Sequence, residues 1–158
     1  MADNVLTTLQ RHPFVEDFAA EHVDKLAGIA ARVRFDRDQI VFREGDECSD
    51  FFLIVSGLMA LEISESGHTH RIQTLSAGHE FGWSALLMGS GKHFQARALE
   101  RVEALALDGG ELLTACKRDP QFGFVLMHRL LAVVADRLQA TRLQLHDMYS
   151  PVAKRAGA

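Results

Sequence analysis

Cysteine and basic charge are both scarce in this sequence, and each scarcity excludes a class of protein. Cys48 and Cys116 are the only cysteines among 158 residues, and their spacing is not that of a metal site. Lysine and arginine number 17 against 21 acidic residues, so the formal net charge is −4 and no basic footprint for nucleic acid is present. We therefore expect two reduced thiols in a cytoplasmic protein that makes no direct contact with nucleic acid.

Long hydrophobic runs are also missing. No stretch approaches the roughly 18 apolar residues of a membrane-spanning helix. Residues 1–4 (MADN) have neither the basic nor the apolar part of a secretory signal. With 47% hydrophobic and 24% charged residues, the composition is typical of a globular protein. We predict one domain over residues 1–158 that does not associate with a membrane.

Glycine turns divide the middle of the chain into short apolar stretches. Residues 14–32 follow a helical period, whereas residues 33–107 contain short apolar or alternating runs. The turns between these runs fall at Gly45, Gly57, Gly67 and Gly78. The pattern predicts a mainly β fold, a jelly-roll barrel over residues 33–107 with helices on either side.

A long C-terminal helix is predicted over residues 120–149, after a short helix at residues 111–118. Pro120 suits the first helical turn, and Ser150 and Pro151 are expected to end the helix. Apolar positions alternate at spacings of three and four, which is a heptad seam. The seam consists of Phe124, Met127, Leu131, Val134, Leu138, Thr141, Leu145 and Met148.

This seam predicts a homodimer formed through the long helix. Leu130, Val133 and Leu143 make a second apolar face, so one face can pack on the helix's own domain and the other on a partner. The alternative is that both faces belong to the core of one chain. Thr141 interrupts the seam, and a polar residue there sets the register or contacts a ligand.

Three segments, in the same order along the chain, resemble the cyclic nucleotide-binding domain family. They are residues 39–46 (QIVFREGD), 52–57 (FLIVSG) and 75–82 (LSAGHEFG). The likeness covers roughly residues 12–149, and the catabolite activator and fumarate-nitrate regulators belong to this family. It implies a jelly-roll domain with a long C-terminal helix that responds to a cyclic nucleotide or another anionic small molecule.

The resemblance also implies a phosphate-binding cassette after Gly78. Backbone amides from Gly82 to Ala85 would hold an anion, as amides at a glycine turn can. The ligand-binding residues that it predicts are Gly82, Trp83, Ser84, Ala85, Lys92, His93, Thr141 and Arg142.

This cassette departs from the family at its two main side chains. Trp83 stands where the family has a Glu that accepts the ribose hydroxyl, and Lys92 stands where it has a phosphate-binding Arg. Each change removes about 1.5–3 kcal/mol, or about two to four decades of affinity together. His93 and Arg142 also replace small hydroxyl residues. A ligand other than a cyclic nucleotide, or no ligand, therefore remains open.

Several functions are compatible with these observations. The first is a non-enzymatic sensor module with a small-molecule effector and an unidentified protein partner. The second is an interaction or dimerisation module whose pocket Trp83 closes, and the third is a transcription regulator without its DNA-binding half. A metal-dependent cupin comes last, suggested only by His68 and His70 on one side of a strand. No nucleophile elbow, Walker loop or paired carboxylates argue for an enzyme, and no metal site is predicted.

Two further residues have alternative roles. Arg97, inside an alternating strand, either pairs with an acid at the barrel rim or points into the pocket as an anion ligand. Cys116 lies on an apolar helix face, which favours a place in the core over a nucleophilic role.

Overall fold

The computed structural model describes residues 4–47, 49–86 and 94–156, with side chains as far as residue 147. Its strands are β1 (Ala30–Phe35), β2 (Ile40–Phe42), β3 (Asp50–Ser56), β4 (Met59–Glu65), β5 (His68–Leu75), β6 (Glu80–Phe81), β7 (Gln95–Ala98) and β8 (Val102–Asp108). Its helices are α1 (Val5–Gln10), α2 (Ala20–Ile29), α3 (Gly109–Arg118) and α4 (Pro120–Ala156), with short 3-10 turns η1 (Pro13–Val15) and η2 (Trp83–Leu86).

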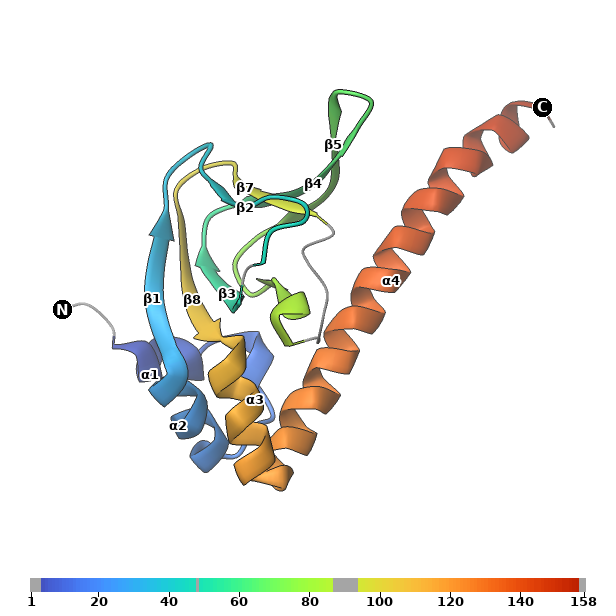
Figure 1. The fold of residues 1–158 in the computed structure, drawn as a ribbon. Coiled ribbons are helices and arrows are strands. Elements are labelled where there is room, and N and C mark those ends of the chain that lie inside the picture. The colour runs from blue at the N-terminus through green and yellow to red at the C-terminus, as the bar shows by residue number, and fades with distance from the viewer. Residues whose placement is uncertain (1–3, 48, 87–93, 157–158) are drawn as a thin grey trace.

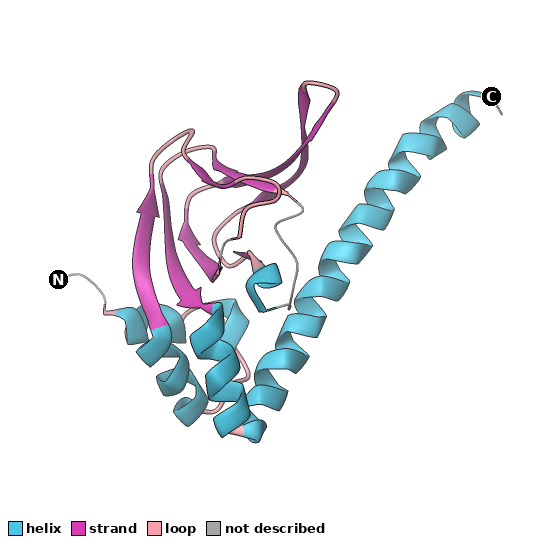
Figure 2. Cartoon of the chain, viewed as in Figure 1, coloured by secondary structure: helices cyan, strands magenta, loops and turns pink. Residues whose placement is uncertain are grey.

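The strands form two antiparallel sheets, in the orders β1-β8-β3-β6 and β2-β7-β4-β5. Helices α1, α2 and α3 gather at one end of the strands, and α4 starts there and leans away from the strands on one side, ending about level with the tip of the β4–β5 hairpin (Figure 1). Figure 2 shows the same division into a strand region and a helical region. The predicted fold class, a jelly roll with flanking helices and a long C-terminal helix, is confirmed.

Strand β3 is buried on both of its faces. Phe52 and Ile54 belong to the core between the two sheets, whereas Phe51 and Leu53 belong to a second core against the helices. Successive side chains of a strand point to opposite faces, so a strand in the middle of three layers must be apolar throughout.

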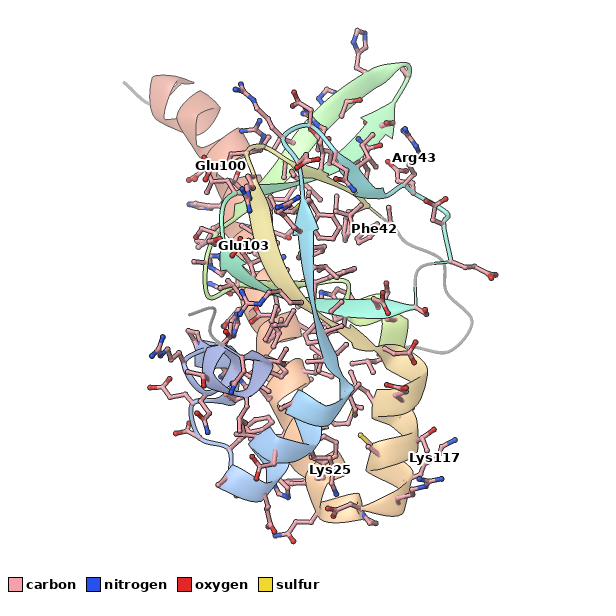
Figure 3. The ribbon with its side chains drawn as sticks, turned by 90° about the vertical axis from the view of Figure 1, so that its left-hand side faces the viewer. Lys25, Phe42, Arg43, Glu100, Glu103 and Lys117 are labelled. Atoms are coloured by element: carbon pink, nitrogen blue, oxygen red, sulfur yellow. The ribbon has the colours of Figure 1, made fainter. Side chains whose placement is uncertain are left out.

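The end of β2 differs from β3 because one of its faces meets solvent. Phe42 is buried, and the next side chain along the chain, Arg43, is exposed (Figure 3).

The helical core anchors the first half of α4 to the barrel. Phe122, Leu126, Leu130 and Val133 are buried on one stripe of α4, at the spacing of a helix face that packs on a sheet. Full burial of such side chains stabilises a fold by about 1.5–3 kcal/mol each. The beginning of α4 is therefore fixed.

The N-terminal region differs from the predicted helix over residues 14–32. The chain forms η1 and the shorter α2, and from Ala30 it is already strand, because β1 pairs with β8 from Ala30–Leu107 to Phe35–Val102. Sheet pairing outweighs the local helical pattern. The strand region thus begins at Ala30 rather than Val33. Helix α1 was not predicted; Asn4 caps it by accepting a hydrogen bond from the amide of Thr7 at 2.7 Å.

The long helix starts at Pro120 as predicted but ends later. It continues through Pro151 to Ala156, whereas the sequence pattern placed its end near Tyr149. A proline inside a helix removes one backbone hydrogen bond and bends the axis, and helix-forming residues beyond it can continue the helix. Among the described residues, no helix is both long enough and apolar enough to cross a membrane.

Candidate functional site

The cassette begins with a glycine turn followed by a single helical turn. Gly82 has φ +81°, a conformation that side chains rarely adopt, and it joins β6 to η2. Within this turn the amide of Ala85 donates a hydrogen bond to the Gly82 carbonyl at 3.0 Å. The Ala85 amide, predicted to hold an anion, is thus engaged inside the turn.

Helix α3 supports the turn from behind. A side-chain carbon at Gly109 would lie 2.5 Å from the Ala85 carbonyl oxygen and 2.9 Å from that of Ser49. The Gly109 amide also donates to the Ser49 carbonyl at 2.7 Å. The absence of a side chain at Gly109 lets α3, η2 and the start of β3 meet backbone to backbone.

A cavity of about 410 Å³ lies between the strands, η2 and α4. The strands contribute side chains such as Phe42, Leu61 and Ile72, and α4 contributes Val134 and Leu138. Because no single element encloses it, a molecule in this cavity would touch the barrel and the long helix at once.

Four of the predicted ligand residues line this cavity: Gly82, Trp83, Ser84 and Thr141. Ala85 is not among the lining residues. Arg142 is exposed and does not line the cavity either, because one helical residue turns the side chain by about 100° away from Thr141. Lys92 and His93 lie outside the described residues.

Trp83 lies between the cavity and the protein core. It is partly buried, packs against the helical core and also lines the cavity. The side chain therefore forms part of the wall, and 410 Å³ of space remains beside it. Because the indole lines the cavity, its fluorescence emission should change when a molecule fills that space.

Arg137, on α4, is a cavity residue that the sequence analysis missed. Its guanidinium donates hydrogen bonds to the backbone carbonyl of Glu80 and, at 3.3 Å, to Oε1 of Gln73. The Glu80 carboxylate is 3.9 Å from Nη2. Burial raises the pKa of the Glu80 carboxyl and lowers that of Arg137, and each partner's charge opposes the other's shift.

Gln144 is a second cavity residue that was missed. Its Nε2 donates to the Ile72 carbonyl at 2.5 Å, so it joins α4 to β5 as Arg137 does. Both residues could have been found from Thr141, because Arg137 precedes it by four positions and Gln144 follows it by three. Such spacings place side chains on the same face of a helix.

The apolar seam of α4 is largely exposed. Leu131, Leu138 and Leu145 are 65%, 62% and 49% exposed, and Met127 is 38% exposed. Val134, by contrast, is partly buried in the cavity wall, and the Thr141 hydroxyl donates to the Arg137 carbonyl at 3.0 Å. The side chain of Met148 lies outside the described part. Of the second face, Leu130 and Val133 are buried in the core, whereas Leu143 is 55% exposed.

Four other residues for which the sequence suggested a functional role do not line the cavity: Arg97, Cys116, His68 and His70. Arg97 pairs with the buried Glu62, which is the first of its two predicted alternatives. Cys116 is partly buried against the helical core, and burial raises the pKa of its thiol. His68 and His70 are exposed on β5, and no group of three potential metal ligands occurs among the described residues.

Comparison with known proteins agrees with this architecture. The family model for the cyclic nucleotide-binding domain matches residues 32–119. The cyclic AMP receptor protein of Thermus thermophilus is 29% identical over 134 residues, which are 84% of this chain and 60% of that protein. A Rhodopseudomonas palustris protein described as a potassium channel is 26% identical over 110 residues, 70% of this chain. This chain spans only 26% of its length.

Solved structures show the same fold. The catabolite activator protein of Thermus thermophilus superposes with a TM-score of 0.71 at 29% identity, covering 87% of this chain and 63% of that one. A cyclic nucleotide-binding domain from Methylobacillus flagellatus gives 0.77 at 20% identity, covering 94% and 82%. With the family model matching more than half of its residues, this chain belongs to the cyclic nucleotide-binding domain family.

Proposed function

We propose that this chain is a non-enzymatic regulatory module that responds to a small molecule bound between its barrel and α4. The observation that carries the proposal is the cavity of about 410 Å³, whose walls come from both the cassette turn and the long helix. A pocket shared by two elements couples ligand occupancy to their relative position, because the ligand's contacts favour one arrangement over others.

The response would be transmitted through α4. Beyond its buried first part, this helix is held to β5 and β6 by side-chain contacts from Arg137 and Gln144, which adjoin the cavity. A ligand that rearranges these contacts shifts the outer half of the helix. That half carries the exposed seam residues Leu138 and Leu145, so we propose that occupancy changes the geometry of a homodimer formed there.

The related Thermus thermophilus protein is named as a cyclic AMP receptor, which supports a ligand-binding role. This chain spans 60% of that protein, so we infer no function from the part of the relative that lies outside the match. We do not infer from this relative that cyclic AMP is the ligand of this chain, because Trp83 stands at the position of the family's ribose-binding Glu.

A second candidate is a dimerisation or interaction module without a ligand. The packing of Trp83 against the helical core favours it, because a wall residue that is anchored in this way also stabilises the empty domain. In this case the exposed seam of α4 would be the functional surface.

Trp83 fluorescence separates the two candidates, because it is the only tryptophan. We would titrate the protein with cyclic AMP, cyclic GMP, cyclic dinucleotides and small organic anions, and follow emission together with the melting temperature. A saturable emission change with a raised melting temperature supports the regulatory module. No response to any of these compounds up to millimolar concentration contradicts it and favours the interaction module.

A further inference from the structure

The cavity between the barrel and α4 has a distinctive chemical character. Nine of the fifteen described residues that line it have apolar or aromatic side chains, among them Phe42, Phe81 and Phe94. Arg137 is the only one of the fifteen that carries a formal charge. The described walls thus offer a hydrocarbon surface and a single positive charge.

Most polar groups in the walls already have partners within the protein. The Thr141 hydroxyl donates to the Arg137 carbonyl at 3.0 Å, and Nε2 of Gln144 donates to the Ile72 carbonyl at 2.5 Å. Oε1 of Gln73 accepts from Arg137 at 3.3 Å. A ligand rich in hydroxyl groups would have to compete with these internal contacts, and the nine apolar or aromatic side chains would offer it no good hydrogen bonds, which makes its binding costly.

Arg137 differs from these groups because it is charged, and its hydrogen bonds still leave N–H donors over. A guanidinium has five N–H groups, and the hydrogen bonds to Gln73 and to the Glu80 carbonyl require two of them. The Glu80 carboxylate forms an ion pair with Arg137 at 3.9 Å, which is too long for a hydrogen bond, so it takes up none of the remaining N–H donors. The side chain of Arg137 is only 13% exposed, so water screens its charge poorly.

We propose that this cavity binds a small apolar monocarboxylate, with the hydrocarbon body against the phenylalanine walls and the carboxylate on the guanidinium of Arg137. The inference rests on the proposed ligand-responsive function and names the class of its ligand. An arginine that presents two parallel N–H groups matches a carboxylate, and burial strengthens such a contact. A volume of about 410 Å³ lies at the lower end of the range for drug-sized ligands, which suits a ring-sized or medium-length acyl body.

The test compares each carboxylate with its uncharged amide. We would measure the binding of 2-naphthoate and 2-naphthamide, and of octanoate and octanamide, by isothermal titration calorimetry with the full chain. Each pair has the same apolar body, so the difference isolates the charge. We expect at least one carboxylate to bind about tenfold or more tightly than its amide, the usual size of a charged hydrogen bond.

Substitutions at Arg137 assign that preference to the guanidinium. In Arg137→Gln the carboxylate and the amide should bind within about threefold of each other, whereas Arg137→Lys keeps the charge and should keep part of the preference. Val134→Phe, which fills the cavity from α4, should weaken carboxylate and amide alike. Circular dichroism and melting temperature check the fold of each variant. If Arg137→Gln does not fold, the lysine variant and the wild-type comparison still decide the question.

The outcomes separate this inference from the proposed function. Equal binding of carboxylate and amide, or a folded Arg137→Gln variant that keeps the preference, overturns the assignment to Arg137. If cyclic AMP binds while neither carboxylate binds or competes, the ligand class is overturned and the regulatory function stands. If no compound binds, both are overturned.

Discussion

Arg97 in β7 and Glu62 in β4 form a two-point ion pair across the sheet. Nη2 of Arg97 donates to Oε2 of Glu62 at 2.6 Å, and Nε donates to Oε1 at 3.0 Å. Gln95 adds a further hydrogen bond to the same carboxylate at 3.0 Å, and Glu62 is only 2% exposed. These contacts hold the pKa of Glu62 below its ordinary value, with the hydrogen bond from Arg97 as the largest cause. The pair therefore has a structural role.

Replacing Arg97 should destabilise the fold strongly. Arg97→Ala leaves the buried Glu62 carboxylate without its main partner, and we expect a loss of about 2–4 kcal/mol in the free energy of unfolding. The matched control is Arg101→Ala, because the Arg101 side chain is 61% exposed and its ion pair with Glu103 is long, at 3.5 Å. This variant should lose no more than about 0.5 kcal/mol in the free energy of unfolding. Urea unfolding measures both values, and equal losses would contradict the structural role of the pair.

Stability should fall on mild acidification because of His12. Its side chain is 5% exposed, and its Nδ1 accepts a hydrogen bond from the amide of Phe14 at 3.1 Å. Nε2 therefore carries the proton and donates to the Ile54 carbonyl at 3.0 Å. Burial is the main cause that lowers the pKa of His12 below its ordinary value of 6.5; the charges of Arg129 and His79 lower it further, and the backbone hydrogen bonds oppose this.

The sign follows from proton linkage. Below about pH 6.5 His12 is protonated in the unfolded chain, whereas in the folded protein, where its pKa is lower, it stays neutral. Lowering the pH therefore favours unfolding until the pH falls below the pKa of His12 in the folded protein. Urea midpoints measured from pH 8 down to pH 5 should decrease, and His12→Gln should flatten this decrease. His70→Gln, at an exposed position on β5, is the control and should leave the slope unchanged. A slope that His12→Gln does not alter would exclude His12 as the cause.

Gly109 should tolerate no side chain. In Gly109→Ala the added carbon would lie 2.5 Å from the backbone oxygen of Ala85, so α3 or the cassette turn must move. We expect a loss of about 1–3 kcal/mol in urea unfolding, the usual cost of overpacking, together with changed Trp83 emission. Gly28→Ala in α2 is the matched control, because nothing lies within 4 Å of its added carbon. That change should leave stability unaltered or raise it by up to about 1 kcal/mol.

The proposed homodimer depends on the exposed seam of α4. Leu131→Glu places a charge at a side chain that is 65% exposed in the single chain, so it should separate a dimer without unfolding the protomer. Light scattering after size exclusion should show a dimer for the wild type and a monomer for the variant. Gln139→Glu adds the same charge at an exposed α4 position outside the seam and should leave the dimer intact. A monomeric wild type would remove the dimer from the proposed mechanism.

The fold was predictable because its signals are local and repeated. Glycines at the turns, alternating apolar residues and three family-like segments each lie within a few neighbouring positions, and the structure has strands and turns there. Element ends were less predictable. The start of β1 at Ala30 depends on a partner strand more than seventy positions away, and α4 passes a proline that a local reading takes as its end.

The candidate site was predictable only where its residues have a local signal in the sequence. Gly82, Trp83 and Ser84 are adjacent in a recognisable segment, and Thr141 interrupts a regular seam, so each has a signal in the sequence. For Arg137 the sequence offers only its spacing of four from Thr141, which places it on the same helix face. Its contacts with the Glu80 carbonyl and with Gln73 come from other elements and have no local signal.

The jelly-roll fold, the long C-terminal helix and the apolar seam of that helix could be predicted from the amino-acid sequence, because turns and periodicity are properties of neighbouring residues. The pairing of Arg97 with Glu62 and the place of Arg137 in the cavity wall depend on how distant elements pack together. Arg97 lies between Ala96 and Ala98, and Arg137 lies between Asp136 and Leu138; neither setting tells whether the guanidinium forms an internal ion pair or faces a cavity. What each one does depends on the carboxylates and carbonyls that the packing of distant strands and α4 brings within reach of its guanidinium.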